Sequence, residues 1–308
     1  MNIWEQQARN RRNTVLLIVL FIAVVAAIGY GADWYFGTGE FPFLTVFALL
    51  IAVGQALVGY FAGDKIALTL SKARPVTGLT LKERQLINVT EEMAVAAGIP
   101  MPKLYIIPDS DLNAFATGRS PRHASVAVTQ GLLDSLSRDE LQAVVAHEIG
   151  HIRNYDIRLM TLVAVLLGTV LILADMLRYA LFWGGQRDRR SEGNVLLLVA
   201  WLVVAILAPL AAYLIAMAVS RQREYYADAT SAELTRNPEA LIRALQKIAA
   251  AIQPTTAIPQ SLAHMCIEDP RGRPINERSD FWSELFATHP PLHKRIEALR
   301  RMAYLQAS

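Results

Sequence analysis

Cysteine is almost absent from this chain of 308 residues, because Cys266 is the only one. A single thiol excludes an intrachain disulfide and a cysteine-rich zinc finger, and it does not distinguish an oxidising from a reducing compartment. An excess of either charge is also lacking, since 30 Lys and Arg stand against 27 Asp and Glu. The sequence has no stripe of basic residues interleaved with aromatics, and we therefore expect no nucleic-acid partner.

Hydrophobic residues, by contrast, make up 53% of the chain and gather in long uncharged runs, a pattern that indicates a lipid bilayer. The runs 14–32 and 41–63 are each long enough to cross a hydrocarbon core of about 30 Å. A cleaved secretory signal would have a shorter apolar region and no second run so close behind it. We therefore predict an N-terminal transmembrane hairpin.

The charges around this hairpin predict its orientation. The connection between the two runs holds Asp33 and Glu40 but no basic residue. Basic residues lie beyond the outer ends of the runs: Arg9, Arg11, Arg12, Lys65, Lys72 and Arg74. By the positive-inside rule, the N-terminus and the chain after residue 63 face the cytoplasm.

Two further apolar runs cover residues 159–177 and 195–219. Their length favours a second transmembrane pair, although the connecting loop with Arg187, Arg189 and Arg190 would then be exported against the usual bias. A hairpin that dips into the membrane or packs on the domain is the alternative. We expect Asp175, inside the first of these runs, to face protein rather than lipid.

The polar part of the chain has local signals for helices and strands. Residues 79–97 have helical periodicity that ends at Gly98-Ile99-Pro100, and 103–108 and 124–129 are typical of strands. Residues 124–129 form either an edge strand on which an extended peptide pairs or an ordinary sheet strand. Ser137 and Glu140 form a capping box that predicts the start of another helix.

That helix carries the motif His147-Glu148-Ile149-Gly150-His151. Histidines at i and i+4 project from one helical face and can bind one metal ion, and Glu148 lies within reach of a water on that ion. Zinc lowers the pKa of its water from 15.7 to about 7, and a neighbouring carboxylate can take the proton. The motif predicts a zinc site with Glu148 as general base, whereas the alternative is a coincidental surface pair.

A catalytic zinc needs a third protein ligand. The metzincin pattern would require Gly at 154 and His at 157, and Asn154 and Ile157 exclude it. Glu224 and Asp228 are again i and i+4, so one can bind zinc while the other accepts a hydrogen bond from a ligand imidazole. An exposed helix with Arg–Glu pairs is equally compatible with this spacing. The other candidate ligands are His123, His264, His289, His293 and Cys266.

Taken in order along nearly the whole chain, these motifs resemble the M48 family of membrane-associated zinc peptidases, most closely its HtpX-type heat-shock proteases of bacterial inner membranes. Besides the hairpin and the metal helix with Asn154 and Asp156 after it, the matching segments are Ala73-Arg74-Pro75-Val76, the segment 112–118, the segment 220–228, Thr288-His289-Pro290-Pro291, and Arg295-Ile296. Each is weak alone, but together they are specific.

The resemblance implies a role for several residues. It implies that Glu224 is the third zinc ligand and that Asp228 supports His147. It further implies that Asn113 contacts the peptide substrate and that His289 stabilises the oxyanion. Two alternatives stay open for Arg295: it stabilises the oxyanion in place of His289, or it only anchors the last helix. No catalytic position matches His123, His264, His293 or Cys266, for which surface or core roles are expected.

The fold implied is a mostly α membrane protein with an α+β zincin-like (gluzincin) catalytic domain. It comprises a transmembrane hairpin (1–63), a first part of the metallopeptidase domain with the zinc helix (64–158), a second apolar hairpin, transmembrane by length (159–219), and the rest of the domain (220–308). We expect one Zn²⁺ per chain and a multi-pass protein of the plasma (cell inner) membrane. Its catalytic domain would be cytoplasmic.

The expected activity is that of a zinc metalloendopeptidase in the stress response, which cleaves membrane proteins or misfolded polypeptides at the cytoplasmic face of the bilayer. Two other functions stay open. One is a zinc-stabilised chaperone or scaffold that binds clients without cutting them. The other is an enzyme for prenylated peptides, although that related branch usually has a longer chain with more spans.

Overall fold

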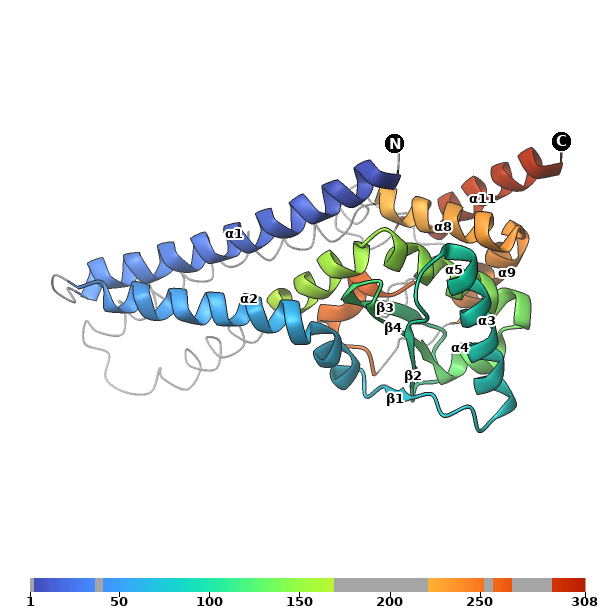
Figure 1. Cartoon of the computed structure of the whole chain (residues 1–308), viewed down its shortest axis with the longest axis horizontal. Coiled ribbons are helices and arrows are strands. Elements are labelled where there is room, and N and C mark those ends of the chain that lie inside the picture. Colours follow the sequence, from blue (N-terminus) through green and yellow to red (C-terminus); the bar gives the residue numbers. More distant parts are fainter. Residues whose placement is uncertain (1–2, 37–40, 169–220, 252–256, 268–289, 308) are drawn as a thin grey trace.

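The computed structural model describes residues 3–36, 41–168, 221–251, 257–267 and 290–307. It is mostly helical: a long hairpin of α1 (Ile3–Phe36) and α2 (Phe43–Leu70) projects from a domain in which helices surround a small sheet (Figure 1). The second half of the third predicted apolar run, Asp175, the loop 187–192 and the fourth run lie outside the described residues.

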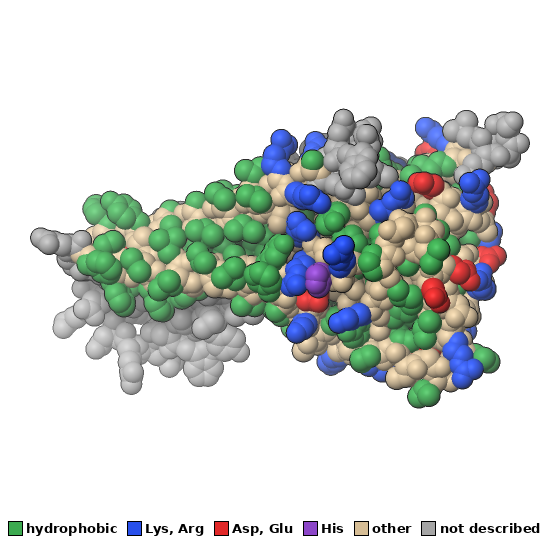
Figure 2. Space-filling model, in the orientation of Figure 1, with side chains coloured by type: hydrophobic (Ala, Val, Ile, Leu, Met, Phe, Trp, Pro, Cys, Tyr) green, Lys and Arg blue, Asp and Glu red, His purple; other side chains and the backbone are tan. Residues whose placement is uncertain are grey.

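Two helical segments, Ala8–Gly31 and Phe43–Leu70, are long and apolar enough to cross a membrane, in agreement with the predicted runs. Hydrophobic side chains cover the hairpin, and Lys and Arg gather where it meets the domain (Figure 2). Asp33 closes the hairpin, because its carboxylate accepts hydrogen bonds from the backbone N–H groups of Leu44 and Thr45 at 2.9 and 2.7 Å. These N–H groups lie in the first turn of α2, where they have no partner within the helix, and Asp33 supplies one.

The third predicted apolar run begins in a helical segment, residues 156–168, that packs against the hairpin. Leu159, Leu162, Val163 and Leu166 share a buried cluster with side chains of α1 and α2. The buried residues of α2 are mostly small: Ala52, Ala56, Gly59, Gly63, Ala67 and Leu68. A Cβ on Gly63 would lie 2.7 Å from Cγ2 of Thr161, so the absence of a side chain allows the two helices to approach.

The four-stranded sheet has the order β1-β2-β4-β3, with β2 and β4 parallel and the other neighbours antiparallel. Its strands are β1 (Arg74–Pro75), β2 (Lys103–Ile107), β3 (Ala114–Ser120) and β4 (His123–Thr129). The strands predicted at 103–108 and 124–129 are confirmed. The strand β3, rich in small residues, was not predicted, because it lacks the β-branched run that marked 103–108 and the alternation that marked 124–129.

The interpretation of 124–129 as an edge strand is wrong, because β4 lies inside the sheet between β2 and β3. The outer strands are β1 and β3, and part of the edge of β3 is already paired. There the carbonyl of Ala114 accepts a hydrogen bond from Ile267 N–H at 2.9 Å, and Phe115 lies opposite Cys266.

Helix α3 (Leu81–Ala97) agrees with the predicted helix to within two residues. Thr80 caps its first turn, and Gly98 ends it with a left-handed φ of +67°. In that first turn the carboxylate of Glu83 accepts hydrogen bonds from Arg74 and Thr77 and from the backbone N–H of Gly78. These donors, Arg74 foremost, lower the pKa of Glu83 from 4.5 to about 2.

Helix α5 (Arg138–Arg153) contributes to the main hydrophobic core, and its residues 143–152 are all buried. The predicted capping box is present: Ser137 accepts from Glu140 N–H, and Glu140 accepts from Ser137 N–H. The remaining elements are α4 (Gln130–Ser135), α8 (Arg221–Thr235), α9 (Pro238–Ala250), the 3-10 helix η1 (Gln260–Met265) and α11 (Leu292–Ala307).

Candidate metal centre

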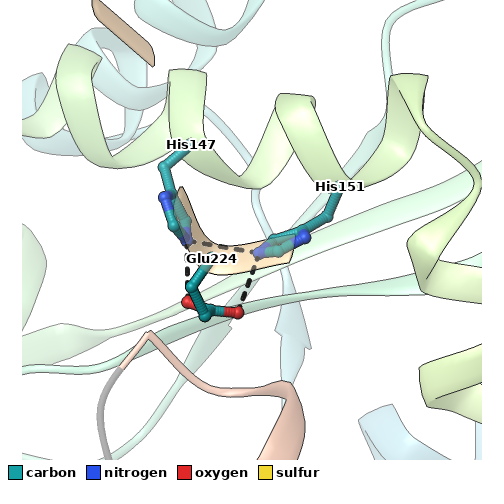
Figure 3. A group of neighbouring side chains, drawn as sticks. All are labelled: His147, His151 and Glu224. Atoms are coloured by element: carbon teal, nitrogen blue, oxygen red, sulfur yellow. Dashed lines mark hydrogen bonds and ion pairs between the residues drawn. The ribbon is translucent and has the colours of Figure 1, made fainter. Parts of the chain in front are cut away.

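The two histidines of α5 face Glu224 of α8 (Figure 3). The Nε2 atoms of His147 and His151 are 3.2 Å apart, and the Glu224 carboxylate lies 3.6 Å from the first and 3.5 Å from the second. A tetrahedral zinc with bonds of about 2.0–2.2 Å holds its ligand atoms roughly 3.3–3.5 Å apart. The three side chains therefore fit one such ion.

Small residues bring α8 close enough to α5 for Glu224 to reach the histidines. A Cβ on Gly150 would lie only 3.2 Å from Cα of Ala227. One turn further along, the hydroxyl of Ser231 donates to the carbonyl of Ala143 at 2.7 Å. Gly150 thus sets the spacing of the two helices, a role that the motif alone did not reveal.

A carboxylate and an arginine support His147 on the side away from Glu224. Its Nδ1 donates to Asp228 at 2.9 Å, so Nε2 is left with the lone pair that a metal needs. Burial would lower the pKa of His147, but without a metal the hydrogen bonds to Asp228 and Glu224 raise it to about 9. Metal binding must therefore release the proton on Nε2 and leave the imidazole neutral. Arg295 donates two hydrogen bonds to Asp228, and its charge holds the pKa of that carboxyl low against the effect of burial.

A second carboxylate supports His151. Nδ1 of His151 lies 3.1 Å from Oδ2 of Asp156, which is fully buried. Sequence reasoning noted Asp156 as part of a motif without a role. The only sequence signal for this contact was the position of Asp156, five residues after His151. The approach of the Asp156 carboxylate to the His151 ring depends on the turn at Asn154 and Tyr155.

The balance of buried charge also favours a cation. Four carboxylates and two guanidinium groups are buried around the histidines: Glu148, Asp156, Glu224, Asp228, Arg223 and Arg295. With neutral imidazoles the carboxylates are in excess by two, which a divalent ion would balance.

Glu148 lies beside the three candidate ligands and is 1% exposed. Neither of its oxygens has a hydrogen-bond donor among the residues that the structure describes. A buried carboxylate normally has such a partner, so we expect a polar group that is not part of these residues to contact Glu148. Burial raises the pKa of Glu148, which brings the carboxylate closer to the pKa that a general base needs.

The other predicted residues are not among the three candidate ligands, and one of them lies outside the described residues. Asn113 is buried just before β3, where its side-chain oxygen accepts from Ala114 N–H, and its contact with substrate stays a prediction. His289 lies outside the described residues. His264 and Cys266 are core residues, and His123 and His293 are exposed, as expected.

Two histidines one helical turn apart, a carboxylate from a second helix and a buried glutamate beside them are the parts of a metallopeptidase centre. The chain belongs to peptidase family M48, because the sequence model of that family matches residues 80–303. This range holds every side chain of the metal cluster and its supporting carboxylates.

Two relatives with more than a third of their residues identical agree with this assignment. The chain is 43% identical to a protease HtpX homolog of Thermoanaerobacter pseudethanolicus, over 97% of this chain and 98% of that protein. It is 40% identical to a protease HtpX homolog of Streptococcus uberis, over 97% and 100%. The resemblance to HtpX-type proteases is therefore confirmed. The crystal structure of S. mikatae Ste24p aligns with a TM-score of 0.49 and 20% identity, over 96% of this chain and 66% of that one.

Proposed function

We propose that the chain is a zinc-dependent endopeptidase that acts at the cytoplasmic face of a membrane. One observation carries the proposal: His147, His151 and Glu224 converge at the spacing of zinc ligands beside the buried carboxylate of Glu148, which accepts no hydrogen bond from the described part of the chain. When bound, zinc would acidify a water molecule and polarise the peptide carbonyl.

The residues of the chain divide the remaining work. Glu148 takes the proton of the attacking water and then passes it to the leaving amine of the cleaved peptide. Asp228 and Asp156 keep the proton of each imidazole on Nδ1, so both Nε2 atoms stay available to the metal. Asn113 is proposed to bind the peptide backbone, and His289 to stabilise the developing oxyanion.

The position of the hairpin supports a site close to the membrane. The N-terminal end of α1 and the C-terminal end of α2 both lie at the domain, where the basic side chains gather (Figures 1 and 2). By the positive-inside rule this end of the hairpin faces the cytoplasm. We also propose that the apolar residues after 168 continue into the bilayer, which the packing of 156–168 along both hairpin helices supports.

The test is cleavage of an unfolded membrane protein by the purified full-length chain with zinc, followed by mass spectrometry of the fragments. Changing Glu148 to Gln should lower the rate by about 10²–10⁴-fold while zinc stays bound. A chelator should abolish cleavage, and zinc should restore it. Glu91→Gln, at an exposed position of α3, is the matched control and should change nothing.

Two outcomes would contradict the proposal in different ways. Full activity of the Glu148→Gln variant would show that another group serves as the base. Zinc-dependent binding of the unfolded protein by the unaltered chain, without any cleavage, would instead identify a chaperone or scaffold.

A further inference from the structure

Helix α1 of the hairpin contacts the supports of the metal centre through the side chain of Asn10. Its amide nitrogen donates hydrogen bonds to Oδ1 of Asp156 and, at 3.0 Å, to the carbonyl of Asn154. The other oxygen of Asp156 lies 3.1 Å from Nδ1 of His151. Asn10 is 3% exposed and Asp156 is fully buried, so water does not compete for these bonds.

Both protons of the Asn10 amide group are used as hydrogen-bond donors. An amide NH₂ has two protons to donate, and here one acceptor is the carbonyl that ends α5 and the other is the Asp156 carboxylate. An aspartate in its place would have the same shape but no donor. It would also put a second negative charge beside Asp156.

The turn that holds Asp156 depends on α1 in a second way. Tyr155, between Asn154 and Asp156, has a φ of +61°. This left-handed backbone conformation is unfavourable for residues that have a Cβ. The guanidinium of Arg11 lies over the Tyr155 ring at 4.9 Å. Two consecutive residues of α1 therefore hold the backbone and the ring of this turn.

The two histidines thus have equivalent supports from opposite ends of the chain. Asp228 orients His147 and is held by Arg295 of α11, whereas Asp156 orients His151 and is held by Asn10 of α1. We propose that Asn10 is a positioning residue of the metal centre, so that α1 takes part in building the zinc site as well as in anchoring the chain. This inference rests on the zinc site proposed above.

The consequence is a link between the seating of α1 and the affinity for metal. Losing a residue that directly supports a ligand histidine lowers metal affinity about 10–100-fold. Asn10 is one hydrogen bond further away, so we expect a loss near the lower end, about tenfold. The residue lies outside the range 80–303 that matches the family model.

The experiment measures zinc affinity of the full-length chain in detergent, by competition with a chromophoric chelator, and the visible absorption of the cobalt-substituted protein. Asn10→Leu and Asn10→Asp should each lower zinc affinity about tenfold and change the cobalt spectrum. Asn13→Leu, on the same helix at a half-buried position, is the matched control and should do neither.

A double substitution separates positioning from a general loss of folding. In an Asp156→Ala background, Asn10→Leu should add no further loss, because the side chain through which it acts is gone. An equal loss in both backgrounds, or an unchanged affinity and spectrum in Asn10→Leu, would overturn the inference. If the unaltered chain bound no zinc, or if His151→Ala did not weaken binding, the proposed zinc site itself would be wrong.

Discussion

Arg295 donates hydrogen bonds of 2.9 and 2.7 Å to the two oxygens of Asp228, and neither side chain is exposed. A third bond, from the same guanidinium to the carbonyl of Ile267, is also 2.9 Å long. This arrangement ties α11 to α8 directly behind the candidate ligand His147. The guanidinium fork suits it because its donors match both oxygens of a carboxylate at once.

We expect Arg295→Met to lower the free energy of unfolding by about 3–5 kcal/mol, because it leaves the buried Asp228 charge without its cation. Arg295→Lys should not restore the free energy of unfolding, since one ammonium group does not bond both oxygens of Asp228 in this geometry. Denaturant unfolding of the purified protein measures the change. Arg301→Met is the control on the same helix: its pair with Glu297 is exposed and should contribute less than about 1 kcal/mol. Equal effects of the two substitutions would contradict the prediction.

Enlarging Gly150 should separate Glu224 from the two histidines. Leucine at this position has no space against Ala227 and Thr230, so α8 must shift away from α5. We expect zinc affinity to fall by at least about tenfold, as when a ligand loses its support. Gly31→Leu serves as control, because no atom of the described residues, apart from its own helix backbone, lies within 4 Å of an added Cβ. Unchanged zinc affinity in the Gly150→Leu protein would show that the helix spacing is not limiting.

The contact of α2 with the segment 156–168 can be tested by a pair of compensating changes. Gly63→Ala places a Cβ 2.7 Å from Cγ2 of Thr161 and should cost about 1–3 kcal/mol through overpacking. Thr161→Ser removes that methyl group and keeps the hydroxyl that contacts Thr117, so the double variant should regain stability. At Gly54 an added Cβ meets no neighbouring segment in the described ranges, so Gly54→Ala should be neutral or slightly stabilising. Thermal unfolding in detergent compares the four proteins, and failure of the serine to compensate would reject this contact.

The lowered pKa of Glu83 predicts that the stability of the fold depends on pH. Its pKa is lowered from 4.5 to about 2 in the folded chain, so its stabilising effect is present above pH 4.5. The effect is then lost as the pH falls from there towards 2, because protonation removes the acceptor for Arg74 and Thr77. Glu83→Gln should be less stable at pH 7 and should lose less stability between these pH values. Unfolding curves over this range test it, with the exposed Glu91→Gln as control.

The sequence by itself determined the elements whose signals are local. Long uncharged runs predict the two apolar helices, the Ser137–Glu140 capping box predicts the start of α5, and a glycine marks the end of α3. The pair of histidines needs only the period of one helix to share a face. Glu224 and Asp228 also share a face by spacing, but only the family motif indicated which of them would approach the metal.

The tertiary structure alone decided how distant segments meet. Strand β4 lies inside the sheet because β3, which has few residues typical of strands, pairs along its far side. Arg295 meets Asp228 across 67 positions, and Asn10 meets Asp156 across 146. No periodicity or capping rule extends over such separations, because these contacts depend on how whole helices pack. The candidate ligands and the place of Asp228 beside His147 were therefore predictable from the sequence together with the family motif. The contacts of Arg295 and Asn10 that hold the two supporting carboxylates in place were not.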